Sequence, residues 1–286
     1  MHRNMKKPPT AAALLFLITA ILTLAVSAGA AAKDLDVPYV ASPDKVVDLM
    51  MDQADIGLGD YVIDLGTGDG RIAIAAVKKG ATGLGVDLDP QLIRKARTKA
   101  KAAGVSDRLV FRVQDLFATD IRRASVVTIF LNEKVNLKLR DTLLRELEPG
   151  TRVVSHNFDM GDWHPDKHQG ILVNNGPNYY MHDVYTWIIP ARLEGHWQWQ
   201  AAGRHFSMTV TQKYQDIDAR LEAGNSALKV QEAYLSGRRI NISALEEGTG
   251  NAYTFIGNVA GGNISGEARI ESDGRISVED WSAAGD

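Results

Sequence analysis

Short strand-like and helix-like segments alternate five times between about residues 39 and 166 of this 286-residue chain. The apolar run Tyr61–Leu65 precedes a helical pattern over residues 71–79, and strand-like runs recur at 83–87, 109–113, 126–131 and 152–156. This alternation is typical of parallel strands joined by crossover helices. We therefore predict an α/β domain with a doubly wound, mostly parallel sheet.

From about residue 170 the pattern changes to β-structure. Eight short apolar or alternating runs lie between residues 184 and 281, and Gly, Asn, Asp and Ser turns separate them. Runs of this kind form antiparallel meanders, sandwiches or small barrels. We predict a smaller antiparallel all-β C-terminal domain and place the two domains at residues 33–168 and 169–286.

The first predicted helix begins at Ser42-Pro43. A serine side chain can cap a helix N-terminus, and proline suits the first helical position. Val46, Val47 and Met50 then fall on one face, which is predicted to be buried.

Residues 1–32 have the pattern of a secretory signal peptide. A basic start precedes an uncharged apolar run from Ala11 to Val26, and Ala28-Gly29-Ala30 provides a cleavage motif. The alternative is an uncleaved anchor, because residues 11–32 approach the roughly 20 residues that span a bilayer. The first interpretation predicts a periplasmic or otherwise exported protein, and the second predicts membrane association through residues 11–32 in the inner membrane.

Composition excludes several classes of function. The formal net charge is -3, and the basic residues of the leader leave the rest of the chain more acidic, so we expect no nucleic-acid partner. The absence of cysteine excludes thiolate metal sites and cysteine nucleophiles. His164 and His168 have the spacing of a metal-binding pair, but Pro165 between them favours a loop, so no metal site is predicted.

A glycine-rich turn follows the first predicted strand and reads Asp64-Leu-Gly-Thr-Gly-Asp-Gly70. Ligands of open parallel sheets bind at the carboxyl ends of the strands, and glycine lets ligand atoms approach the backbone. Asp64 and Asp69 would repel a pyrophosphate and attract a cationic group. S-adenosylmethionine (SAM) carries an ammonium and a sulfonium, so the acids and the G-x-G-x-G spacing predict SAM as the cofactor.

Two further acids follow later strands. Asp87 ends the second strand, where a carboxylate can accept both ribose hydroxyls. Asp115 follows the third strand and can accept an adenine amino hydrogen, with Leu88 and Leu116 as apolar neighbours of the ring. Asp89 is predicted to cap the next helix instead. The predicted cofactor-binding residues are Asp64, Gly66, Thr67, Gly68, Asp69, Gly70, Asp87, Leu88, Asp115 and Leu116.

These segments resemble class I SAM-dependent methyltransferases. The general resemblance is carried by residues 64–76, by Gly85-Val-Asp-Leu-Asp-Pro90 and by Asp115-Leu-Phe117. A narrower similarity is to the lysine methyltransferases of the mitochondrial adenine nucleotide carrier and the ATP synthase c subunit, and to their prokaryotic relatives. It is carried by the segment Pro38–Pro43 and by Trp163-His-Pro-Asp166. The resemblance implies that the glycine loop holds the methionine part of SAM, Asp87 the ribose and Asp115 the adenine.

The resemblance implies a methyltransferase whose partners are SAM and a protein or small-molecule methyl acceptor, with a protein lysine amine as the preferred acceptor. Together with residues 1–32, it predicts an exported or membrane-anchored enzyme. The chain departs from these relatives at Leu131–Lys134, where they have a proline-containing segment. Asn132 and Glu133 are the predicted catalytic residues, since a polar mouth would orient an amine, although Glu133 also suits an exposed helix start. The alternative function is a non-catalytic SAM-binding scaffold or sensor whose β domain is an envelope interaction module.

An aromatic-rich stretch lies near the predicted domain boundary. It has two interpretations, namely packing of the β domain against the sheet and a recognition face for carbohydrate or protein. Its residues are Tyr179, Tyr180, Tyr185, Trp187, Trp197 and Trp199.

Overall fold

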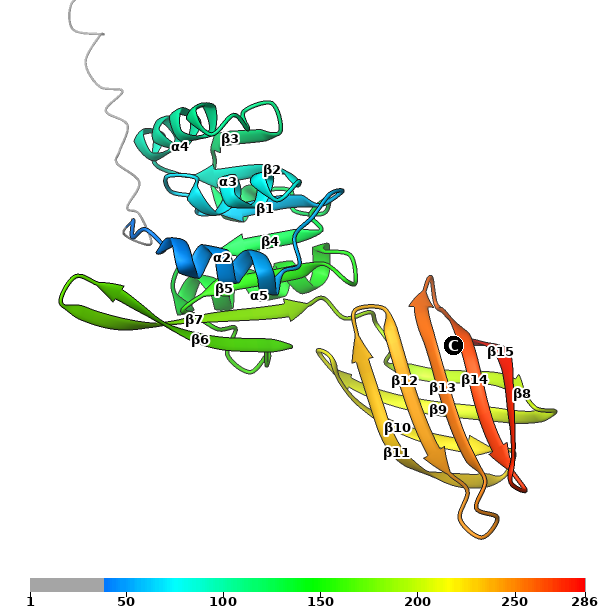
Figure 1. Cartoon of the computed structure of the whole chain (residues 1–286). Coiled ribbons are helices and arrows are strands. Elements are labelled where there is room, and N and C mark those ends of the chain that lie inside the picture. The colour runs from blue at the N-terminus through cyan, green and yellow to red at the C-terminus, as the bar shows by residue number, and fades with distance from the viewer. Residues whose placement is uncertain (1–38, 286) are drawn as a thin grey trace, which may run out of the picture. The chain divides into compact units, whose positions relative to one another are not determined.

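The structure is a computed structural model that describes residues 39–285, in which a seven-stranded sheet precedes a closed barrel (Figure 1). The predicted signal peptide or anchor at residues 1–32 lies outside the described residues. Among the residues that are described, no helix is both long enough and apolar enough to cross a membrane.

The first sheet has the strand order β3-β2-β1-β4-β5-β7-β6. Strands β1 to β5 pair in parallel, and the order reverses between β1 and β4. Strand β7 is antiparallel to both β5 and β6. The predicted doubly wound, mostly parallel sheet is thus confirmed. Its strands are β1 (Tyr61–Leu65), β2 (Thr82–Asp87), β3 (Leu109–Val113), β4 (Val126–Ile129), β5 (Arg152–His156), β6 (Lys167–Asn175) and β7 (Asn178–Ile188).

Helices cover both faces of this sheet. Val46 and Met50 of one helix and Ile72 of the next pack in one apolar cluster with the sheet. Leu139 and Leu143 belong to a second cluster on the opposite face. The helices are α2 (Asp44–Gln53), α3 (Arg71–Lys78), α4 (Pro90–Ala102) and α5 (Glu133–Glu146), and a 3-10 turn, η1, spans Leu116–Ala118.

Helix α2 begins without the predicted serine cap. Pro43 occupies the N-cap position, and no side chain there accepts a hydrogen bond from the helix. The Ser42 hydroxyl lies 2.9 Å from Nδ1 of His156 instead. The predicted cap was wrong because β5 presents a buried imidazole to this hydroxyl, a long-range contact that local sequence does not reveal.

The hairpin of β6 and β7 joins the first sheet, although the sequence pattern places residues 169–286 in the predicted C-terminal β domain. Thr186 of β7 donates to Gln53 of α2 at 2.8 Å, and the buried Trp187 packs in the core on the other face. The residue pattern of these strands is typical of antiparallel strands, and such a pattern does not indicate which sheet a strand will join.

The remaining strands form a closed eight-stranded antiparallel barrel. Each strand pairs with the next along the chain, and β15 closes the barrel on β8. The ring of Trp199 lies 4.9 Å from that of Phe255 and 5.0 Å from that of Trp281, so aromatic side chains fill the interior. The strands are β8 (Gly195–Ala201), β9 (Arg204–Lys213), β10 (Asp216–Ala223), β11 (Ser226–Ser236), β12 (Arg239–Leu245), β13 (Ala252–Ala260), β14 (Asn263–Ser272) and β15 (Arg275–Gly285).

Candidate functional site

The glycine loop lies at the carboxyl edge of the sheet, where the strand order reverses. The backbone N–H groups of Gly66 and Thr67 both donate to the Val86 carbonyl, at 2.9 and 2.8 Å, which fastens the loop to β2. Gly68 has a φ of +54°, and a Cβ there would lie 2.6 Å from the ring of Tyr39. Both the conformation and the close approach require glycine at this position.

Asp64 supports the loop from beneath. Its side chain is 1% exposed and accepts hydrogen bonds from Thr67 Oγ1 at 2.6 Å and Thr128 Oγ1 at 2.7 Å. The backbone N–H of Ala73, in the first turn of α3, donates to the same carboxylate. Burial raises the pKa of Asp64 to about 6. Asp64 therefore connects β1, the loop, α3 and β4.

Asp69 is also held within the fold. Its buried carboxylate accepts from Arg71 at 2.8 Å and from Lys99. Burial alone would raise the pKa of Asp69, but the hydrogen bonds from these two cations hold it well below its usual range. Asp64 and Asp69 were expected to attract a cationic ligand group, whereas both carboxylates have partners inside the protein and hold the loop in place.

Asp87 occupies the position predicted for a ribose acceptor, at the end of β2. Its Oδ2 atom accepts from the backbone N–H of Gly68, and its Oδ1 atom accepts from the backbone N–H of Asp89, both at 2.9 Å. The side chain is only partly buried. Asp89 accepts from Gln91 N at 2.6 Å and is the N-cap of α4, as predicted.

Asp115 follows β3, the neighbour of β2, and is the N-cap of the turn η1. Its Oδ1 atom accepts from the backbone N–H of Phe117 at 3.0 Å. Leu88 and Leu116 are both partly buried. The residues predicted to contact ribose and adenine thus lie at the ends of two adjacent strands.

The predicted catalytic residues lie where β4 leads into α5. Asn132 Oδ1 accepts from Val135 N at 2.9 Å, so Asn132 is the N-cap of this helix. Glu133 is exposed in the first turn, where a carboxylate is favourable beside the helix N-terminus. Both side chains therefore have a structural role, and their part in catalysis stays a prediction.

The structure pairs His156 with His182, a contact that the sequence does not indicate. His156 is fully buried at the end of β5, and its Nε2 atom lies 2.9 Å from Nδ1 of His182. The ring of Phe130, which follows β4, lies 3.8 Å from the His156 ring. Burial lowers the pKa of His156 to about 3, so the imidazole is neutral near pH 7. The hydrogen bond to Ser42 extends this contact to the segment before α2.

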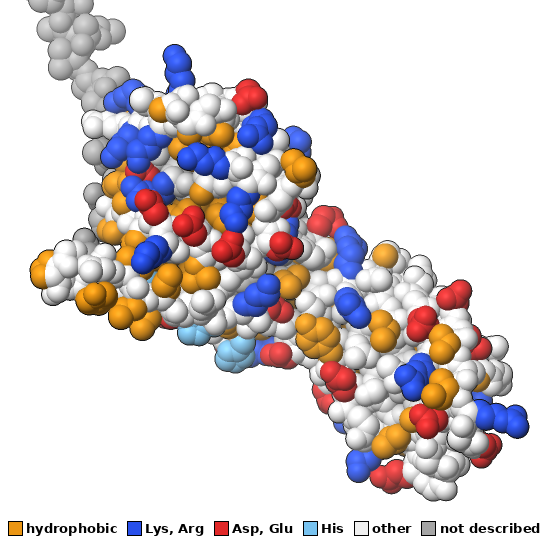
Figure 2. Space-filling model, in the orientation of Figure 1, with side chains coloured by type: hydrophobic (Ala, Val, Ile, Leu, Met, Phe, Trp, Pro, Cys, Tyr) orange, Lys and Arg blue, Asp and Glu red, His pale blue; other side chains and the backbone are white. Residues whose placement is uncertain are grey.

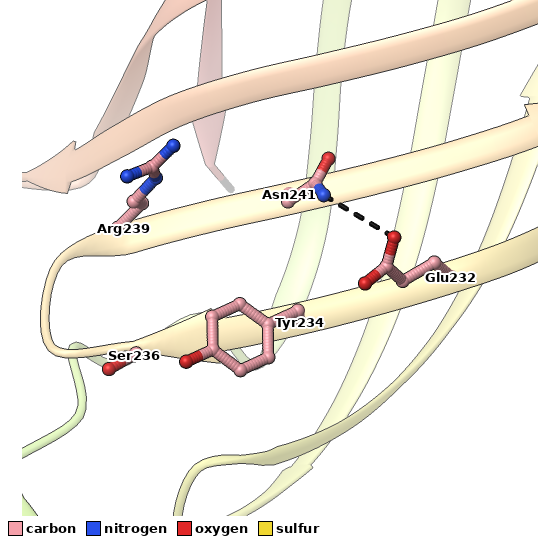
Figure 3. A pocket seen from close by; sticks show the side chains of 5 residues that line it. All are labelled: Glu232, Tyr234, Ser236, Arg239 and Asn241. Atoms are coloured by element: carbon pink, nitrogen blue, oxygen red, sulfur yellow. Dashed lines mark hydrogen bonds between the residues drawn. The ribbon is translucent and has the colours of Figure 1, made fainter.

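A separate hollow of about 470 Å³ lies on the barrel (Figure 3). Within it, Asn241 Nδ2 donates to Glu232 at 3.4 Å. None of the residues predicted to bind a cofactor or to act in catalysis lines this hollow. Its lining residues are Glu232, Tyr234, Ser236, Arg239 and Asn241.

Known proteins match the α/β domain. The ANTKMT methyltransferase domain family matches residues 64–167. A protein-lysine N-methyltransferase of Saccharolobus islandicus is 41% identical over 155 residues, which cover 54% of this chain and 94% of that protein. The chain belongs to this methyltransferase family.

Other relatives of this methyltransferase are longer. The adenine nucleotide translocase lysine N-methyltransferase of Mus musculus is 36% identical over 132 residues, which cover 46% of this chain and 57% of that protein. The methyltransferase therefore spans little more than half of that relative. A similar solved structure is that of an RNA methyltransferase from Salinibacter ruber in complex with S-adenosyl-L-homocysteine. Its sequence is 47% identical, the TM-score is 0.48, and the match covers 54% of this chain and 96% of that chain.

SAM is the cofactor of this family, and the donor set of the methyltransferase fits it. The two backbone donors to Asp87 fix the carboxylate while its remaining lone pairs are available to the ribose hydroxyls. Leu88 and Leu116, which directly follow Asp87 and Asp115 in the chain, supply partly exposed apolar surface. The charge of Asp69 is paired with those of Arg71 and Lys99, and Asp64 is buried beneath the loop.

The raised pKa of Asp64 gives a testable pH dependence. Because the folded-state pKa of about 6 exceeds the ordinary value of 3.8, stabilisation by protonated Asp64 is complete below about pH 4 and is lost as the pH rises through 6. This shift corresponds to about 3 kcal/mol. Asn cannot titrate, so we expect Asp64→Asn not to show this loss of stability. The difference in the free energy of unfolding, wild type minus variant, should therefore decrease as the pH is raised from 4 to 7.5.

Urea unfolding of both proteins at these two pH values measures the difference, with Asp120→Asn as the matched surface control. Asp120 is exposed and paired with Arg122, so its replacement should leave the trend of the wild type between pH 4 and 7.5 in place. A constant difference between wild type and Asp64→Asn at both pH values would contradict the raised pKa.

Proposed function

We propose that this methyltransferase transfers the methyl group of SAM to the side-chain amine of a protein lysine. The observation that carries the proposal is the 41% identity to an archaeal protein-lysine N-methyltransferase over nearly all of that protein's length. The family match and the lysine-modifying relatives of animals support the same acceptor class.

The residues of the chain act mainly by binding and orientation. When bound, SAM supplies an electrophilic methyl group on its sulfonium. The glycine loop positions the methionine part, Asp87 holds the ribose, and Asp115 with Leu116 holds the adenine. Alignment of a neutral amine with the methyl group lowers the barrier by proximity, an effect that can be worth about 7–11 kcal/mol. Asn132, the N-cap of α5, lies where β4 leads into this helix and is proposed to orient the amine.

The test uses the full chain with SAM labelled in its methyl group and the proteins of a cell extract as acceptors. We expect label to enter protein and to be recovered as methyl-lysine after acid hydrolysis. An extract whose lysine amines have first been blocked by acetylation should take up no label, because an amide nitrogen is not nucleophilic. Equal labelling of the blocked and unblocked extracts would contradict a lysine acceptor.

We also propose that residues 1–32 direct the chain out of the cytoplasm. The support is the sequence order of basic residues, apolar run and Ala28-Gly29-Ala30. N-terminal sequencing of the protein recovered from fractionated bacterial cells should show a start just after this motif, in the exported fraction. An intact N-terminus in the membrane fraction would favour the anchor instead, and recovery from the cytoplasm would contradict export.

A further inference from the structure

The hairpin of β6 and β7 projects beyond the carboxyl edge of the sheet (Figure 1). Strand β7 pairs with β5 only as far as Val184, which lies opposite His156. The pairing of β6 with β7 continues past this point to Asn175 and Asn178. The outer part of the hairpin therefore extends on the edge of the sheet that carries the glycine loop and the start of α5.

The outer hairpin has no charge and exposes large apolar side chains. Residues 169–182 contain no Asp, Glu, Lys or Arg. Leu172 is 55% exposed, Met181 61% and Tyr179 63%. Leu172 lies opposite Met181, and Tyr179 lies two residues from Met181 on the same face. We call these three side chains the apolar strip, and Figure 2 shows hydrophobic side chains along the projecting hairpin.

Strand β6 is also an edge strand without the usual protection. It is the last strand of the sheet, and among the described residues no strand pairs with its outer side. Edge strands are commonly protected by lysine, proline or a bulge. Between Gln169 and Asn175 the sequence has neither residue, and the register with β7 is continuous. Such an edge can accept an extended segment of another protein as an additional strand.

Negative charge lies at the base of the strip. Asp183 precedes Val184 on β7, and its carboxylate lies 2.8 Å from Nε2 of His168. Asp159 follows β5, and burial together with the charges of Asp183 and Asp159 raises the pKa of Tyr185. A lysine of an acceptor protein that reaches the carboxyl edge along the strip would thus meet the two carboxylates. Uncharged residues next to that lysine in the acceptor would contact the uncharged outer hairpin.

On the basis of the proposed function, we propose that the β6–β7 hairpin is the docking surface for the methyl-accepting protein. The acceptor binds as an extended, uncharged and apolar segment that adds to the edge of β6 and covers the apolar strip. Its lysine then lies beyond the segment, at the carboxyl edge of the sheet. A contiguous hydrophobic surface left exposed on a folded domain marks such a binding site.

The test uses three synthetic peptides of equal length, each with one central lysine. The first has Val, Leu and Ala flanks, the second has Ser, Gln and Gly flanks, and the third is the apolar peptide with N-methyl groups on alternate backbone nitrogens. We expect the full chain to methylate the first with the lowest KM. The third should lose this advantage, because N-methylation removes the donors needed for strand addition.

The double variant Leu172→Ser/Met181→Ser tests the strip. We expect it to raise the KM for the apolar peptide at least about tenfold, with kcat and the affinity for SAM unchanged. The matched control is Ile276→Ser/Val278→Ser, which removes two apolar side chains of the barrel strand β15 that are 54% and 56% exposed. This control should leave the KM unchanged.

The outcomes separate the docking surface from the reaction. Methylation with the same KM in wild type and the strip variant would overturn the docking proposal alone. If wild type sediments as a dimer and the strip variant does not, while the KM is the same in both, the strip binds a second copy of the chain and the docking proposal is overturned. If wild type binds phosphatidylcholine vesicles and the strip variant does not, again with the same KM, the strip binds lipid and the proposal is overturned as well. If no peptide is methylated, equal labelling of extract proteins by wild type and the strip variant overturns it. Absence of methyl-lysine from both peptides and extract contradicts the proposed function itself.

Discussion

Replacing Asp87 with alanine is expected to lower the affinity for SAM and S-adenosylhomocysteine at least about 100-fold. We propose that the carboxylate accepts hydrogen bonds from the ribose hydroxyls, and each hydrogen bond to a charged group is worth about 1.5–3 kcal/mol. The variant also releases the backbone N–H groups of Gly68 and Asp89, which Asp87 fixes at 2.9 Å. Calorimetric titration of the full chain with S-adenosylhomocysteine measures the change.

Asp89→Ala is the matched control, because it removes a carboxylate two residues away. Asp89 caps α4 through Gln91 N, so its loss should cost about 1 kcal/mol of stability and leave the ligand affinity within about threefold. Wild-type affinity in Asp87→Ala, or equal losses of affinity in the two variants, would contradict the assignment of Asp87 to the ribose.

The change Gly266→Ala is expected to destabilise the barrel by about 3 kcal/mol or more, because overpacking against the backbone cannot be relieved by a rotamer change. A Cβ at Gly266 would lie 2.5 Å from Cα of Gly257 and would also collide with the Ile256 carbonyl oxygen. These atoms belong to β13, which pairs directly with β14. The two strands would have to separate at this point.

Urea unfolding followed by tryptophan fluorescence reports on this change, since Trp281 lies opposite Gly266 on β15. Ser265→Ala is the control, because Ser265 is exposed on the adjacent position of the same strand. A loss of less than about 1 kcal/mol in Gly266→Ala, similar to that of the control, would show that the close approach of β13 and β14 does not depend on glycine.

The order of strands and helices in the α/β domain was predictable, because each depends on a local pattern. Apolar runs such as Tyr61–Leu65 and a cap such as Asp89 leave their signal within a few residues of sequence. The position of the glycine loop followed from the same local reasoning. Asp64 was predicted to belong to the site, but the hydrogen bond that it accepts from Thr128 was not predicted.

The features that sequence missed depend on contacts between distant segments. Ser42 bonds His156 across more than a hundred residues, so its role as a cap could not be excluded locally. Asp69 meets Lys99 only after α4 has packed beside α3. The strands β6 and β7 look like those of the barrel, and only their pairing with β5 assigns them to the first sheet. Pairing between strands is set by tertiary packing rather than by the composition of either strand.

The closure of the barrel has a consequence for how quickly it folds. Strands β8 to β15 follow one another as hairpins, so most of their pairing is local and can form in microseconds. The joint between β8 and β15 brings Gln198 to Ala284 and Trp197 to Gly285, which are 86 and 88 residues apart in the chain. This contact carries the highest loop-closure entropy in the barrel, so it should form late in folding. Amide hydrogens along this joint should accordingly exchange with solvent faster than those between β13 and β14, because the joint can open without disrupting the hairpins.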